Sequence, residues 1–137
     1  LSDGRVMLNS RSVYGNNRRK TAISEDGGES WSGLEDVSEL IECSCQGSII
    51  RYTYSYKGQD SRILFANPAS EEERSKGTVR MSYDEGKTWP VSKTIYAGYY
   101  AYSCLVVLSN MEIGVLFERD NYSKITFKRF SLEWLKS

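Results

Sequence analysis

Short runs rich in apolar residues, separated by turn signals, recur along the chain. Runs that are rich in β-branched and aromatic residues and end at glycine, proline, asparagine or aspartate predict strands. We expect strands at Arg5–Ser12, Lys20–Ser24, Gln46–Tyr56, Arg62–Asn67, Gly77–Tyr83, Tyr102–Leu108, Ile113–Glu118 and Lys124–Phe130. Their succession predicts an all-β protein, in which the later strands form an antiparallel meander.

Two segments favour a helix instead, namely Gly33–Ile41 and Ser131–Lys136. The acidic run at residues 71–73 lies between predicted strands, and we expect a solvated loop there because charge runs usually face water.

A turn sequence occurs twice. Ser24–Trp31 and Ser82–Trp89 share the frame S-x-D-x-G-x-[ST]-W. A repeated turn between strands is typical of radial β architectures, of which the β-propeller is the main example.

The frame has a physical explanation. Its aspartate carboxylate can accept hydrogen bonds from backbone N–H groups of the same turn, and its Ser or Thr hydroxyl can close the loop. We expect Gly28 and Gly86 to have positive φ, which other residues resist. Trp31 and Trp89 are expected to fold back as apolar plugs between sheets. We therefore interpret both turns as structural.

Composition excludes several classes of function. The 18 basic and 18 acidic residues balance, so no net field favours nucleic acid or an anionic membrane. The chain has no histidine, which excludes Ser/His and Cys/His nucleophiles and most zinc sites. No run approaches the roughly 20 apolar residues of a membrane helix, and no signal peptide is visible. The chain opens with Leu1 and a turn, so we expect it to begin inside a fold.

The three cysteines do not predict a disulfide framework, because their number is odd. Cys43 and Cys45 stand two apart in a predicted strand, which would place their side chains on one face. We expect Cys43, Cys45 and Cys104 to be buried or free thiols.

Further strings narrow the family. They are Asn67-Pro68-Ala69, Thr78–Pro90, Tyr96-Ala97-Gly98, Ala101-Tyr102-Ser103, Ile113–Glu118 and Phe130–Leu135. Together with the repeated turn, known as the Asp-box, they resemble bacterial-type sialidases over essentially the whole chain. The resemblance implies a six-bladed β-propeller of antiparallel sheets with Asp-box turns. Residues 1–137 would be the C-terminal part of its catalytic domain, about three blades.

The resemblance also implies a clamp for the carboxylate of sialic acid. Arginine suits this task because it is always charged and offers two parallel donors. Arg11 and Arg74 match the second and third arginines of the family's three, and the first is absent here. Either residue could instead be an ordinary surface arginine. Arg80 is the rival of Arg74, and we expect it to face away from the cleft.

Tyr102 matches the family's nucleophile. Sialidases with a tyrosine nucleophile are an exception to the two-carboxylate scheme of most glycosidases. A phenol needs a nearby general base; the family's glutamate base and its aspartate acid lie upstream and are absent from the chain. Tyr99 and Tyr100 are the neighbouring alternatives, and a core-facing tyrosine is the alternative to catalysis.

Two more residues are expected to support the site. Glu118 resembles the carboxylate that orients the missing first arginine, and Gln46 would touch the sugar or brace the pocket. Asp26 and Asp84 belong to the repeated turns, so we do not assign them as catalytic acids.

The resemblance therefore predicts an exo-α-sialidase that retains configuration and needs no metal or cofactor, inactive as this chain alone. Sialylated glycans are the expected partners, together with the rest of the propeller or a second copy to cover exposed edges. The expected location is secreted, periplasmic or cell-surface. The alternatives are a non-catalytic Asp-box propeller that binds glycan or protein, and a purely structural half-propeller.

Overall fold

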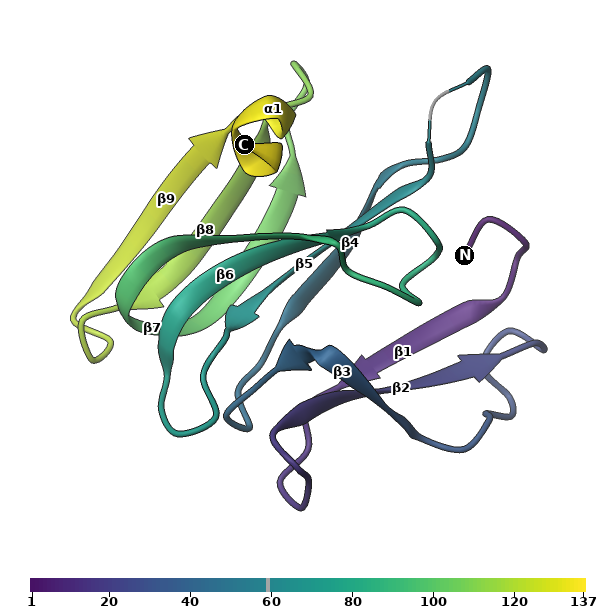
Figure 1. Ribbon diagram of the computed structural model, residues 1–137, viewed down its shortest axis with the longest axis horizontal. Coiled ribbons are helices and arrows are strands. Elements are labelled where there is room, and N and C mark those ends of the chain that lie inside the picture. Colours follow the sequence, from purple (N-terminus) through teal and green to yellow (C-terminus); the bar gives the residue numbers. More distant parts are fainter. Residues whose placement is uncertain (59) are drawn as a thin grey trace.

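The computed structural model describes residues 1–58 and 60–137, which form nine strands and one short helix (Figure 1). The elements are β1 (Val6–Ser10), β2 (Arg18–Ser24), β3 (Glu35–Ile41), β4 (Ser48–Thr53), β5 (Arg62–Pro68), β6 (Ser75–Ser82), β7 (Val91–Val107), β8 (Ile113–Arg119), β9 (Lys124–Phe130) and α1 (Leu132–Lys136). The predictions of an all-β class and of a final short helix are confirmed. That helix is too short to cross a membrane, and no other helix occurs in the described part of the chain.

The strands pair in chain order. Among the described residues, β1, β2 and β3 form one sheet and β4 to β9 form a second, and every pair is antiparallel. The 17-residue strand β7 pairs with β6 along its first part and with β8 along its second part. The second sheet curls as it passes through β7 (Figure 1). The predicted meander is thus confirmed, although its longest strand begins well before the expected Tyr102.

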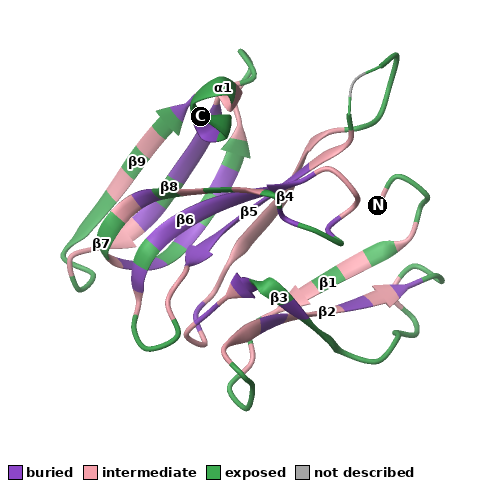
Figure 2. Ribbon diagram, viewed as in Figure 1, coloured by how far each residue is buried: buried purple, intermediate pink, exposed green. Residues whose placement is uncertain are grey.

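Two apolar clusters hold the fold together. In Figure 2, β5, β6 and β8 are the most continuously buried strands. All three contribute to the core inside the curl of the second sheet, and residues of the first sheet pack against Ile63 and Phe65 of β5. The larger cluster fills the inside of that curl and includes Leu64, Val79, Met81, Tyr100 and Val115. The smaller one joins the two sheets and consists of Val37, Leu40, Ile63, Phe65 and Trp89.

The two repeated turns have the same hydrogen bonds. In each, aspartate Oδ1 accepts the backbone N–H of the residue four positions on, at 2.9 Å for Ser30 to Asp26 and 2.9 Å for Thr88 to Asp84. The hydroxyls of these two partners donate to the other carboxylate oxygen, at 2.5 and 2.6 Å. The side-chain and backbone donors of Ser30 lower the pKa of Asp26 to about 2. The hydrogen bonds expected from the frame are therefore present in both copies.

The glycines of the two turns have the same kind of backbone conformation, whereas the two tryptophans differ in burial. Gly28 and Gly86 have φ of 103° and 86°, as predicted. Trp89 is only 3% exposed and meets Phe65 edge to face, with ring centroids 5.9 Å apart. Trp31, however, is 42% exposed. The prediction of an apolar plug is confirmed for Trp89 and wrong for Trp31, because no described element covers the outer side of the turn that follows β2.

This difference gives a stability prediction. We expect Trp89→Ala to lower the free energy of unfolding by about 3–5 kcal/mol, the usual cost of removing a buried large aromatic side chain. Trp31→Ala, which truncates the same residue of the same frame, should cost less than about 1 kcal/mol because much of that ring already faces water. Urea unfolding of both variants measures the difference. Equal losses would contradict the packing described here.

The predicted helix at Gly33–Ile41 is wrong, because most of that segment is strand β3. Its buried residues, Val37 and Leu40, are three apart, which is a helical spacing. The strand pairing explains this spacing. Arg19 pairs with Val37 but the adjacent Arg18 pairs with Ile41, so three residues of β3 bulge between them. The bulge turns Val37 and Leu40 toward the same core.

Cys43 and Cys45 do not lie in a strand, contrary to expectation. They lie between β3 and β4, where Ser44 has a φ of 58°. All three cysteines are free thiols; Cys45 is buried, Cys43 half-buried and Cys104 exposed. Burial raises the pKa of the Cys43 thiol to about 11, so this thiol stays protonated at neutral pH.

Glu85 links three parts of the chain. Its carboxylate accepts two hydrogen bonds from Arg51 of β4, both 2.7 Å long, and one of 2.8 Å from the backbone N–H of Ser2. It also accepts a hydrogen bond from Ser61. These donors, Arg51 first, hold the pKa of Glu85 far below its ordinary value of 4.5.

The lowered pKa of Glu85 predicts a pH dependence. A carboxyl group whose pKa is lower in the folded than in the unfolded state stabilises the fold above the unfolded value, and this contribution is lost as the pH falls. We therefore expect Glu85→Gln to reduce the loss of stability between about pH 4.5 and pH 2. Thermal unfolding at a series of pH values tests this. If the variant and the wild-type protein lose stability in parallel, the assignment of this carboxylate is wrong.

Candidate functional site

Arg11 lies just beyond the end of β1, in the connection to β2, and its side chain is exposed. Its guanidinium Nη1 is 3.4 Å from the hydroxyl of Tyr102 and 3.4 Å from the carbonyl oxygen of Ser44. Arg11 was expected within a strand, but β1 ends one residue before it. The sheet therefore brings Arg11 to the site from its end rather than from its face.

Arg74 approaches the same tyrosine from a second segment. It immediately precedes β6, and its carbonyl oxygen accepts a 2.8 Å hydrogen bond from the backbone N–H of Tyr100. Its guanidinium carbon lies 5.3 Å from the centre of the Tyr102 ring and 6.0 Å from that of Tyr122. This is within the range in which a cation is attracted to an aromatic face. Arg11 and Arg74 therefore converge on one phenol.

Tyr102 projects from a bulge in β7. Tyr100 pairs with Arg119 and Ser103 with Phe117, so two residues of β7 face the single residue Glu118 of β8. A bulge of this kind turns a side chain and leaves a backbone group without its ladder partner. Glu118 compensates here, because its Oε2 accepts the Tyr102 N–H at 3.2 Å. In this structure Glu118 therefore braces the backbone that carries Tyr102.

Gln46 braces the next residue of β7. Its side-chain amide takes the place of a strand partner: Oε1 accepts the Ser103 N–H at 2.9 Å, and Nε2 donates to the Ser103 carbonyl at 3.0 Å. Of the two roles expected for Gln46, the contacts describe the bracing one. Glu118 and Gln46 together fix the backbone at and just after Tyr102.

The alternatives to Arg74 and Tyr102 lie in other positions. Arg80 is 5% exposed and donates to Asn67 Oδ1 at 3.1 Å, and burial lowers its pKa to about 10. Tyr100 is fully buried and stacks on Phe117, with ring centroids 4.8 Å apart. Tyr99 packs edge to face against Tyr122 at 5.4 Å. Arg80 and Tyr100 are thus interior residues, whereas Tyr99 lies at the margin of the site.

Sequence reasoning missed two contributors. Tyr122 accepts a hydrogen bond from Arg74 Nη1. It reaches this position because Asp120, Asn121 and Tyr122 have consecutive positive φ values of 52°, 53° and 65°. No pattern in the sequence announces such a turn. The second is Glu42, a fully buried carboxylate that accepts the backbone N–H of Ser12, the residue after Arg11.

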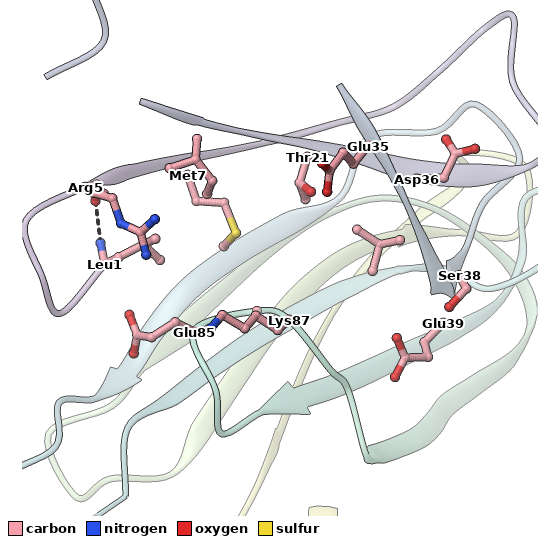
Figure 3. Close-up of a pocket in the computed structure, with 13 residues that line it drawn as sticks. Leu1, Arg5, Met7, Thr21, Glu35, Asp36, Ser38, Glu39, Glu85 and Lys87 are labelled. Atoms are coloured by element: carbon pink, nitrogen blue, oxygen red, sulfur yellow. Dashed lines mark hydrogen bonds between the residues drawn. The ribbon is translucent and has the colours of Figure 1, made fainter. Parts of the chain in front are cut away.

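Cavities lie on two sides of the molecule. An apolar pocket of about 360 Å³ adjoins the site; it is lined by Gln46, Tyr102, Ser103, Cys104, Leu116, Phe117, Glu118 and Ile125. The pocket of about 320 Å³ in Figure 3 lies between the first sheet and the turn after β6. The residues that line it do not include Arg11, Arg74 or Tyr102. The first of these two pockets includes residues of the candidate site, namely Gln46, Tyr102 and Glu118.

The arrangement defines a class of site. Two guanidinium groups and a phenol from three separate segments meet at the surface, which suits an anionic ligand held beside a hydroxyl. Among the residues described, His, Cys, Asp and Glu side chains form no group of three or more that could hold a metal ion. The chain is thus an antiparallel all-β protein with a cationic, tyrosine-centred surface site.

Comparison with known proteins shows that this chain is similar to sialidases. The sialidase of Micromonospora viridifaciens is 41% identical over 138 residues, which cover 98% of this chain and 21% of that protein. The sialidase of Bacteroides fragilis is 30% identical over 142 residues, covering 97% of this chain and 25% of that protein. The chain therefore spans about a fifth to a quarter of the length of these curated relatives. No family model matches it.

Solved structures of sialidases are similar to this chain as well. The leech intramolecular trans-sialidase, complexed with 2,7-anhydro-Neu5Ac, superposes with a TM-score of 0.85 at 25% identity, over 99% of this chain and 23% of that one. A Hadza microbial sialidase superposes with a TM-score of 0.82 at 30% identity, over 96% of this chain and 26% of that one. Over nearly its whole length, the chain is similar to a part of bacterial-type sialidases, as its sequence strings predict.

Proposed function

We propose that this chain forms part of the catalytic β-propeller of an exo-α-sialidase, which removes terminal α-linked sialic acids from glycans. The observation that carries the proposal is the convergence on Tyr102: Arg11 Nη1 lies 3.4 Å from its hydroxyl, and the Arg74 guanidinium lies 5.3 Å from its ring centre. A sialic acid has its carboxylate on the reacting anomeric carbon. Two arginines beside the attacking group would bind that carboxylate and offset its charge.

The proposed reaction retains configuration. Tyr102 Oη attacks the anomeric carbon, the bond to the leaving oxygen breaks, and a glycosyl–tyrosine forms. The phenol proton passes to a glutamate base, and an aspartate protonates the leaving oxygen; the family supplies both from segments outside residues 1–137. Water, deprotonated by that aspartate, then attacks the anomeric carbon. The bond from this carbon to Tyr102 Oη breaks, and the glutamate returns its proton to the phenol. A tyrosine suits this step because a carboxylate nucleophile would be repelled by the carboxylate of the substrate.

The fold would be completed by other segments. We propose that the strands correspond to about three blades of a six-bladed propeller with Asp-box turns. The first blade would be β1–β3, the second β4–β6 with the first part of β7, and the third the second part of β7 with β8 and β9. The apolar residues left exposed on β7, β8 and β9, such as Val106, Leu116 and Phe127, support this view, since a closed propeller would cover them. Glu118 would then also meet the first arginine of the family.

A two-part assay tests the proposal. The full-length polypeptide that contains these residues should release the fluorophore from a fluorogenic α-sialoside. Proton NMR should show α-sialic acid as the first product. The 137-residue chain alone should show little or no hydrolysis. If the full-length protein binds a sialylated glycan without cleaving any sialoside, the alternative of a non-catalytic binding propeller replaces this proposal.

A further inference from the structure

Arg19 and Glu42 form an ion pair inside the first sheet. Arg19, on β2, is 3% exposed and Glu42, just after β3, is fully buried; Arg19 Nη1 lies 3.6 Å from Glu42 Oε2. Burial acts to lower the pKa of Arg19, and the charge of Glu42 opposes that effect. Buried ion pairs are costly to desolvate, so they often serve a purpose other than stability. The contacts around this pair suggest what that purpose is.

Each member of the pair holds the backbone on one side of Arg11. On the N-terminal side of Arg11, Arg19 Nε donates to the Asn9 side chain at 2.8 Å and Nη2 donates to the Asn9 carbonyl at 3.2 Å. On the C-terminal side of Arg11, Glu42 Oε1 accepts the Ser12 N–H at 2.7 Å. Arg11 therefore lies within the four-residue span from Asn9 to Ser12, both ends of which are bound to one ion pair.

The segment after Glu42 adds to this hold. Ser44 Oγ donates to the Ser12 carbonyl at 2.6 Å, and the Ser44 carbonyl accepts the 3.4 Å contact from Arg11 Nη1. Arg19 Nη1 donates to the Cys45 carbonyl at 2.9 Å, which fixes the far end of this segment. The guanidinium of Arg11 is exposed, yet its backbone is bound to buried groups on both sides.

We infer that Arg19 and Glu42 are positioning residues for Arg11, which they hold toward Tyr102 by fixing the backbone at Asn9 and Ser12. The inference rests on the proposed function, because Arg11 matters there as a carboxylate ligand. An arginine on a loose loop would lose much of its affinity, since binding would then have to order the loop. The ion pair would order the loop before the substrate binds.

Glu42→Gln is the most direct test, made in the full-length polypeptide. Glu42 meets the Ser12 N–H with Oε1 and Arg19 with Oε2. In the glutamine one of these two positions holds an NH2 group, which donates and cannot accept from the group it faces. We expect KM for a fluorogenic sialoside to rise about tenfold with kcat within about threefold, the pattern of a lost binding interaction. In the Arg11→Ala background, the same change should alter KM by less than about twofold, because residues that act through one another are not additive.

Glu85→Gln is the matched control, because it breaks an Arg–Glu pair of the same chain away from the site. It should lower the melting temperature and leave KM unchanged. If Glu42→Gln fails to fold, Ser44→Gly replaces it: this change removes the hydroxyl that binds Ser12 and suits the φ of 58°. An unchanged KM in a folded Glu42→Gln or Ser44→Gly variant, or an equal rise with and without Arg11, would overturn the inference.

Limited trypsin digestion separates this inference from the proposed function. Cleavage after Arg11 requires the loop to open, and it is measured by mass spectrometry without any substrate. Glu42→Gln should speed that cleavage several-fold while Glu85→Gln should not, as expected when local opening is controlled by nearby contacts. If the wild-type protein hydrolyses no sialoside but the digestion behaves as described, the proposed function fails and the positioning of Arg11 stands. If cleavage after Arg11 is unchanged, the positioning fails.

Discussion

Tyr102→Phe in the full-length polypeptide should lower kcat at least about a hundredfold, the scale of loss when a nucleophile is removed and only binding and charge stabilisation remain. The change removes one hydroxyl, whose contact with a described residue is the 3.4 Å approach of Arg11 Nη1. Tyr102 is 42% exposed and its ring stays in place over Arg74. The melting temperature should therefore hardly change. Initial rates with a fluorogenic sialoside measure the loss.

Tyr99→Phe is the control for this experiment. It removes the same hydroxyl three residues earlier on β7, beside Tyr122 rather than Arg11. We expect its kcat to stay within about threefold of the wild-type value, because the change removes no interaction with the reacting atoms in the proposed transition state. Near-normal turnover by Tyr102→Phe, or equal losses in both variants, would show that Tyr102 is not the nucleophile.

Gly77→Ala is expected to have a large effect on stability, of the same order as Trp89→Ala. A Cβ at Gly77 would lie 2.0 Å from Cδ2 of Tyr100 and 2.4 Å from Cε2 and Cγ. The Tyr100 ring cannot yield, because it is fully buried and stacks on Phe117. Since overpacking usually costs 1–3 kcal/mol, we expect a loss of about 3 kcal/mol or more here.

Gly33→Ala provides the comparison, because a Cβ there meets nothing within 4 Å and Gly33 has no positive φ. Its free energy of unfolding should stay within about 0.5 kcal/mol of the wild-type value. Chemical denaturation of both variants decides the matter. If Gly77→Ala unfolds at the same denaturant concentration as Gly33→Ala, Tyr100 does not pack against this glycine.

The sequence predicted the parts of the fold that depend on local patterns. The apolar runs in β5 and β8 and the shared frame of the two turns were enough to find these elements. The helical spacing of Val37 and Leu40 was misread, since it arises from a bulge whose position depends on pairing with β2. The first part of β7 was missed because its pattern is weak: Ser92, Lys93 and Thr94 are polar neighbours.

Sequence motifs likewise predicted one part of the candidate site and missed another. Motif matching predicted Arg11, Arg74 and Tyr102, and the structure brings all three together. It could not predict Tyr122, whose position depends on a rare run of left-handed residues, nor Glu42, whose partners lie far away in the chain. Contacts of this kind are set by tertiary packing, which a local pattern does not contain.

The continuity of β7 has a consequence for how the molecule opens. Because the strand is hydrogen-bonded to β6 along its first part and to β8 along its second, neither half of the curled sheet can separate without disturbing the other. Native-state hydrogen exchange should therefore show the amides of both parts becoming accessible in one cooperative event, as a single folding unit. The bulge that carries Tyr102 would then be as long-lived as the core beneath it.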